Sequence, residues 1–160
     1  MTIKPRTFGH SAPDALGRKI ALSLEGHVLE AIVHREPGAP PEDGVPPFFE
    51  AGALIDTGAS DVCIDFRLAH ALKLRQIDQR TVGTLGGSVL ANVYLGILEI
   101  PALDHRKLMP LLALRVARVN YSVILGRSFL SDYIVTFDGP NGCCHFIRAE
   151  DAYPPPPDDE

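Results

Sequence analysis

One carboxylate at the end of an apolar run constrains this chain more than any other feature. Residues 48–55 have the length and residue types of a buried strand, and they end at Asp56. Residues 57–60, Thr-Gly-Ala-Ser, are small and mostly polar, which favours a tight turn over a longer strand. A carboxylate at the edge of a core is costly unless it is hydrogen-bonded or protonated. We therefore expect the fold to support Asp56 closely.

A second apolar segment further along the chain is suited to that support. Residues 122–126 read Ser-Val-Ile-Leu-Gly and predict a short strand, and a helix over residues 127–132 follows. The strand ends at Gly126, where a Cβ atom would obstruct a neighbouring segment of chain. The sequence thus predicts close packing of another segment against Gly126.

The two segments together resemble the retropepsins, the retroviral-type aspartic proteases. The resemblance rests on Asp-Thr-Gly-Ala-Ser at 56–60 and on Ile-Leu-Gly-Arg at 124–127. It implies an all-β fold of mainly antiparallel strands with one or two short helices, in which a single-lobe acid-protease barrel forms a two-fold homodimer. The long ending, with a predicted hairpin over 134–147, looks more like cellular DNA-damage-inducible-type and bacterial relatives than like the viral enzymes.

The resemblance also implies roles in the active-site loop. Asp56 would be the catalytic residue, Thr57 would hydrogen-bond across the dimer axis, and Gly58 would let a substrate backbone approach. Ala59 lacks the hydroxyl that pepsin-like enzymes commonly place here to stabilise an ionised pair, which predicts activity from weakly acidic to near-neutral pH. Because the chain has one such loop and the chemistry needs two carboxylates, a second copy must supply the other.

Structural support is expected from Gly126, Arg127 and Asp61. Arg127 matches a family arginine that pairs with an acid just after the active-site loop. Ser60 stands at that acid position here, so the neighbouring Asp61 is a candidate partner. An arginine in water at the start of a helix is the alternative.

A glycine-rich hairpin is predicted between residues 79 and 101. Its tip is not a phosphate-binding loop, because no Lys-Ser/Thr pair and no helix follow the glycines. Glycines let a hairpin tip bend and approach a ligand closely, as a flap over an extended peptide requires. The residues expected in the flap and the substrate pocket are Leu85, Gly86, Gly87, Val89, Ser122 and Ile124.

We expect the whole chain to divide into three parts. Residues 1–18 should form a flexible arm, residues 19–149 the protease domain, and residues 150–160 an acidic, proline-rich, disordered tail. Within the domain we expect a hairpin over 19–34 and a strand pair over 108–119. A proline-rich surface loop over 37–47 and a helix over 66–74, capped by Asp65, complete the prediction.

The charge composition limits the classes of molecule that this chain is expected to bind. Five of the twenty acidic residues lie after position 149, and no Lys or Arg follows Arg148, so the remainder carries fifteen charges of each sign. This balance gives no electrostatic footprint for nucleic acid or an anionic membrane. No secretory signal or membrane-length apolar run is evident, and three cysteines do not suit a disulfide framework, so we expect a cytoplasmic protein. We expect no metal and no cofactor.

The sequence therefore predicts an aspartic endopeptidase, active as a homodimer on extended apolar peptide segments. The alternative is a non-catalytic dimeric module that keeps the fold and holds peptides in the same cleft. A third reading is a zymogen whose N-terminal arm blocks the cleft.

Overall fold

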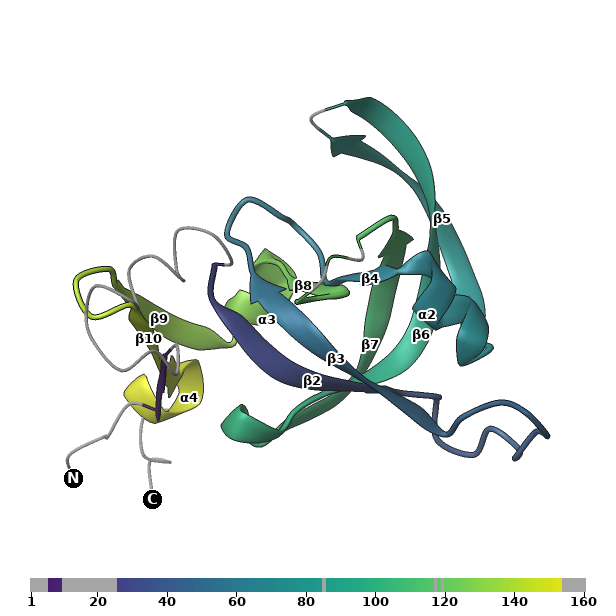
Figure 1. Cartoon of the computed structure of the whole chain (residues 1–160), viewed down its shortest axis with the longest axis horizontal. Coiled ribbons are helices and arrows are strands. Elements are labelled where there is room, and N and C mark those ends of the chain that lie inside the picture. The colour runs from purple at the N-terminus through teal and green to yellow at the C-terminus, as the bar shows by residue number, and fades with distance from the viewer. Residues whose placement is uncertain (1–5, 10–25, 85, 117, 119, 154–160) are drawn as a thin grey trace, which may run out of the picture.

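The computed structural model describes residues 6–9, 26–84, 86–116, 118 and 120–153, which form two sheets with short helices between them (Figure 1). The strands are β1 (Arg6–Gly9), β2 (Val28–His34), β3 (Phe48–Ile55), β4 (Cys63–Asp65), β5 (Arg75–Thr84), β6 (Gly87–Ile100), β7 (His105–Leu114), β8 (Val123–Leu125), β9 (Tyr133–Asp138) and β10 (Cys143–Arg148). The helices are α2 (Phe66–Ala71), α3 (Arg127–Leu130), α4 (Ala149–Ala152) and the 3-10 helix η1 (Pro101–Leu103).

The larger sheet closes into a six-stranded barrel. Its order is β2-β3-β8-β4-β7-β6-β5, and β2 also pairs with β6, so the barrel closes between these two strands and β5 remains outside it. Most pairs are antiparallel, but β3 pairs in parallel with β8, and β4 with β7. The expected all-β, mainly antiparallel class is therefore confirmed.

The apolar residues that predicted the strands form the barrel core. In β2, Leu29, Ala31 and Val33 alternate inward, as a strand with one buried face requires. The strand predicted over residues 48–55 is β3. Removal of these side chains from water is the main driving force for closing the barrel.

Three details differ from the sequence prediction. No strand pair is present among residues 108–116 and 118, the described part of that segment: β7 is one strand whose partners are β6 and β4, and it begins earlier, at the charged segment 105–107. Helix α2 stops at Ala71, although Asp65 caps it as predicted. The described residues hold three short α-helices and a 3-10 helix rather than one or two helices.

The smaller sheet has the order β1-β10-β9. Strand β1 comes from the predicted arm and pairs with β10, while the rest of that arm and residues 19–25 of the predicted first hairpin lie outside the described residues. The hairpin predicted over 134–147 is β9 and β10. The predicted tail begins with the last turn of α4, and its residues 154–160 are likewise outside the described part.

An aromatic cluster joins the two sheets. His105 of β7 packs edge-on against Phe129 of α3, with ring centroids 4.8 Å apart, and its Nδ1 lies 3.0 Å from the Tyr133 hydroxyl. Tyr133 in turn packs edge-on against Phe146 of β10. The buried Nε2 of His105 has no hydrogen-bond partner among the described residues. A proton there would be left without an acceptor.

We expect His105 to make stability depend on pH. Burial lowers the pKa of His105, the nearby Lys107 and Arg148 lower it further, and Asp132 opposes them. The folded pKa thus lies below the unfolded value of about 6.5, so the unfolded chain binds more protons as pH falls through that value. The free energy of unfolding, measured by urea denaturation, should therefore decrease as the pH is lowered from about 7.5 to about 5.5.

The matched comparison uses two histidine variants. His105→Gln should be less stable throughout, because it loses aromatic packing, but its unfolding free energy should vary less with pH. His70→Gln changes an exposed histidine and should keep the wild-type slope. Equal slopes in wild type and His105→Gln would contradict the assignment.

No helix within the described ranges has both the length and the apolar character that crossing a membrane requires.

Candidate active site

Asp56 lies where β3 leaves the barrel, directly beside the end of β8. The register pairs Leu54 with Ile124 and Ile55 with Leu125. The ladder then continues for one more hydrogen bond, from the Asp56 N–H to the Leu125 carbonyl at 3.1 Å. The backbone of Asp56 is therefore held by the barrel, while its half-buried side chain stands at the rim.

The turn after Asp56 wraps around the carboxylate. The Gly58 N–H donates to Asp56 Oδ1 at 2.8 Å, and the Ala59 N–H donates to the Asp56 carbonyl at 3.3 Å. A Cβ atom at Gly58 would lie 3.0 Å from that same carboxylate oxygen. Glycine at this position thus lets the backbone come close enough to hold the carboxylate in one orientation.

Gly126 lies against the backbone of the active-site loop, as its sequence position predicted. A Cβ atom there would be 2.2 Å from the Asp61 carbonyl oxygen and 2.9 Å from that of Ala59, distances no side chain could occupy. The next two residues fasten the loop, because the Arg127 N–H donates to Ala59 O and the Ser128 N–H to Ser60 O, each at 2.9 Å. The start of α3 therefore sets the path of the loop.

The expected pairing of Arg127 with Asp61 is not what the structure shows. Arg127 Nη1 donates to the carbonyl oxygens of Thr57 and Gly58, at 2.9 and 3.1 Å. The Asp61 carboxylate instead lies 3.6 Å from Arg80 of β5. Because a guanidinium group can donate hydrogen bonds to backbone carbonyl oxygens as well as to carboxylates, Arg127 can support the loop without an acidic partner.

A sequence profile of the aspartyl protease family matches residues 49–129. The match spans β3 to α3, and so it includes the Asp56 turn and the Gly126 segment. This chain belongs to the aspartyl protease family.

Several solved structures are similar to this protease domain. The solution structure of the simian foamy virus protease has 18% identity and a TM-score of 0.44, covering 66% of this chain and 92% of that one. A retropepsin-like aspartic protease from Rickettsia conorii has 21% identity and a TM-score of 0.44, covering 75% and 91%. The EIAV protease in complex with the inhibitor HBY-793 has 22% identity and a TM-score of 0.40, covering 52% and 76%. No curated protein matches the sequence significantly.

The predicted pocket residues of the protease domain lie on two elements. The β5–β6 hairpin extends beyond the barrel on the same side as the loop from β3 to β4 (Figure 1). Gly86, Gly87 and Val89 lie at its exposed end, and Leu85 is outside the described residues. Ser122, just before β8, and Ile124 of β8 are half-buried, and Ile124 packs against a small apolar cluster with Cys63 and Val93.

Cys63 is close to the active-site loop but is not suited to nucleophilic chemistry. Burial raises the pKa of its thiol to about 11, and the carboxylates of Asp61 and Asp56 add to the effect. Since the thiolate is the reactive form, the side chain acts as a small apolar residue.

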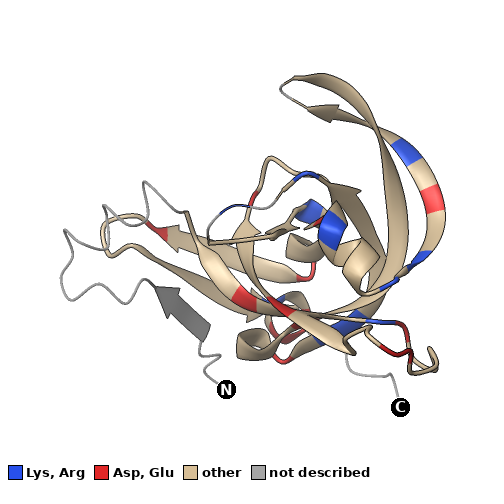
Figure 2. Ribbon diagram, turned by 45° about the vertical axis from the view of Figure 1, so that its right-hand side comes forward, with Lys and Arg blue, Asp and Glu red and all other residues tan. Residues whose placement is uncertain are grey.

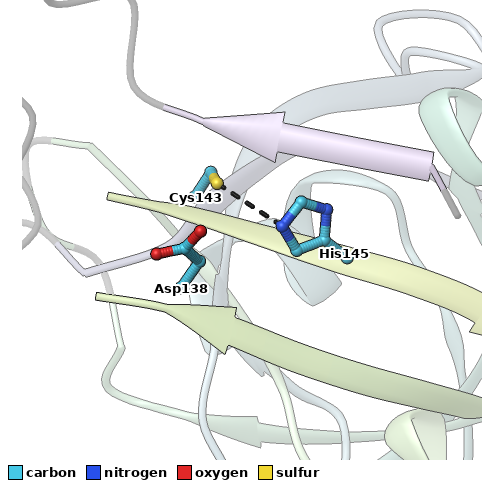
Figure 3. Close-up of side chains that lie close together, drawn as sticks. All are labelled: Asp138, Cys143 and His145. Atoms are coloured by element: carbon cyan, nitrogen blue, oxygen red, sulfur yellow. Dashed lines mark hydrogen bonds between the residues drawn. The ribbon is translucent and has the colours of Figure 1, made fainter. Parts of the chain in front are cut away.

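Sequence reasoning missed two features of the domain. Ser128 Oγ accepts a hydrogen bond from the Val62 N–H at 3.2 Å, and no sequence pattern indicates this contact. The second is a group of three side chains that could hold a metal, Asp138, Cys143 and His145, within the described part of the chain. It lies on β9 and β10 (Figure 3), in the smaller sheet, whereas Asp56 follows β3 of the larger sheet. The alternation of Cys and His along one strand was the sequence signal that could have indicated it.

Proposed function

We propose that this protease domain is an endopeptidase that acts as a homodimer, with one Asp56 from each copy forming the catalytic pair. The observation that carries the proposal is the Asp56 carboxylate itself, oriented at the barrel rim by the Gly58 N–H and by the β8 ladder. The sequence holds one Asp-Thr-Gly turn, so a second carboxylate in the same setting requires a second copy of the chain.

The chemistry follows from two neighbouring carboxylates that share one proton. The ionised carboxylate takes a proton from water while the water oxygen bonds to the peptide carbonyl carbon, and the protonated partner gives its proton to the carbonyl oxygen. The resulting gem-diol then collapses as the C–N bond breaks and the amine nitrogen accepts a proton. The Gly58 hydrogen bond stabilises a charged carboxylate through these proton transfers.

The substrate proposed is an extended peptide segment with apolar side chains. The β5–β6 hairpin would act as a flap, and the peptide would lie beneath it as an added strand. Val89 is 41% exposed and Leu90 66% exposed on this hairpin, and exposed apolar side chains of this kind are suited to contact with apolar peptide side chains. Ala59 and Ile124 would line the other side of the same cleft.

Mixing wild type with Asp56→Asn tests whether each site needs two chains. If the pair forms across a dimer, chains that exchange freely at equal concentration leave about a quarter of the dimers with two carboxylates. Peptidase activity should then fall to about a quarter of that of the same total amount of wild type. The measurement is the initial rate of peptide cleavage after equilibration, with dimer mass followed by light scattering.

The control for mixing is Asp43→Asn, which changes an exposed carboxylate in the proline-rich loop and should leave the rate unchanged at any ratio. A loss of only half of the activity would mean that single chains are active and would overturn the dimer. Absence of cleavage of any peptide in a library by dimeric wild type would favour the peptide-binding module.

We also propose a cytoplasmic location. The three cysteines of the chain are all free, including Cys143 and Cys144 in adjacent positions of β10, which supports a reducing compartment.

A further inference from the structure

The far end of the β9–β10 hairpin carries three side chains with the donor atoms of a metal site. Cys143 and His145 alternate along β10, so both point to the same face of the sheet. Asp138 is the register partner of Cys143 on β9, where directly opposed side chains are close neighbours. Figure 3 shows the Asp138 carboxylate directed from β9 toward Cys143 and His145 of β10.

The distances in this group are close to those of a tetrahedral zinc site. Cys143 Sγ lies 3.6 Å from His145 Nε2. Zinc–sulfur and zinc–nitrogen bonds of about 2.3 and 2.05 Å at a tetrahedral angle place the two ligand atoms about 3.6 Å apart. A carboxylate oxygen of Asp138 lies within 4.8 Å of both atoms, so a side-chain movement of roughly 1 Å completes a three-ligand set.

Asp138 is oriented for this role by the turn that follows it. The Asn141 N–H donates to Asp138 Oδ1 at 3.0 Å, and Asn141 Nδ2 donates to Oδ2 at 2.7 Å. Each carboxylate oxygen can accept two hydrogen bonds or one hydrogen bond and a metal, so both remain available to an ion. Outer partners of this type fix the direction of a ligating side chain.

The chemistry of the donors selects the ion. A thiolate, an imidazole and a carboxylate are suited to a borderline-soft cation such as Zn²⁺, whereas Mg²⁺ and Ca²⁺ prefer oxygen ligands alone. The three side chains are half-buried, which leaves the ion a route from solvent. We propose that Asp138, Cys143 and His145 bind one Zn²⁺ per chain, with water as the fourth ligand, and that the ion ties β9 to β10.

Cobalt substitution tests the site directly. The full chain, treated with a chelator, should bind one equivalent of Co²⁺ and develop the near-ultraviolet thiolate-to-cobalt absorption band. Added Zn²⁺ should remove the band, while excess Mg²⁺ or Ca²⁺ should not. Absence of the band at one equivalent, or its displacement by Mg²⁺, would overturn the proposal.

Variants assign the ligands. Cys143→Ser should lose the band, and His145→Gln and Asp138→Asn should each weaken Co²⁺ binding by more than about tenfold, the lower limit for loss of even an outer partner. Cys144→Ala is the matched control, because Cys144 is the neighbouring cysteine, buried on the opposite face of the strand, and it should leave the band intact. A band that survives in Cys143→Ser, or disappears in Cys144→Ala, would contradict the assignment.

A measurement of thermal stability separates loss of metal binding from failure of a variant to fold. Because an ion that binds only the folded state stabilises it, Zn²⁺ should raise the melting temperature of wild type and of Cys144→Ala but not of Cys143→Ser. Equal shifts in all three would also overturn the site. The hairpin lies on the other side of the barrel from the flap in Figure 1, and none of these readouts depends on peptide cleavage.

Discussion

Asp56→Asn should reduce the rate of peptide cleavage by at least about 10³-fold, because it removes both the general base and the general acid from the proposed symmetric pair. The fold should persist, since the amide oxygen of the new side chain can still accept the Gly58 hydrogen bond. The measurement is kcat/KM on a cleaved peptide, together with the urea midpoint of unfolding.

Asp43→Asn makes the same chemical change at an exposed loop position and should keep wild-type kcat/KM. The prediction distinguishes an enzyme from a peptide-binding module of the same fold. If Asp56→Asn cleaves as fast as wild type, another group performs the chemistry, and the proposed role of Asp56 is wrong.

Gly126→Ala should destabilise the domain by about 3 kcal/mol or more and abolish cleavage, although it adds a single methyl group. The added Cβ would meet the Asp61 carbonyl oxygen at 2.2 Å and the Asp61 carbonyl carbon at 2.8 Å. Both are backbone atoms of the loop that carries Asp56, so relief of the clash requires the loop or β8 to move. The free energy of unfolding from urea titration measures the effect.

Gly139→Ala is the matched control for this substitution. A Cβ atom at Gly139 has no atom within 4 Å, and the residue does not have a positive φ. Its unfolding midpoint should match that of wild type. An unchanged midpoint in Gly126→Ala would show that the loop is not packed against this glycine.

The strands that the sequence predicted best are those with one unambiguous apolar run. Strand β3 has the predicted bounds, because its run ends abruptly at Asp56 and a small-residue turn. A strand pair was predicted over 108–119, but the described residues of this segment contain a single strand, the later part of β7. In the barrel, β7 remains one strand because β6 pairs with it from His105 to Ala113, which local pattern cannot reveal.

The active site shows the same contrast between what local sequence predicts and what tertiary packing decides. The Asp-Thr-Gly turn and the segment ending at Gly126 were paired through the family resemblance, whereas close packing at Gly126 followed from its lack of a side chain. The partner of Arg127 could not be identified in this way. A guanidinium can donate to any suitably placed oxygen, so the choice of the Thr57 and Gly58 carbonyls over Asp61 depends on where the barrel places each group.

Local sequence was sufficient for the position of Asp56 at a strand end and for the proposal that a second copy supplies the other carboxylate, because residue size, polarity and the number of Asp-Thr-Gly turns are properties of the chain alone. Tertiary structure decided the closure between β2 and β6, the contacts of Arg127, and the meeting of Asp138, Cys143 and His145 across two strands. These features depend on the register between segments, and register is set by packing in three dimensions.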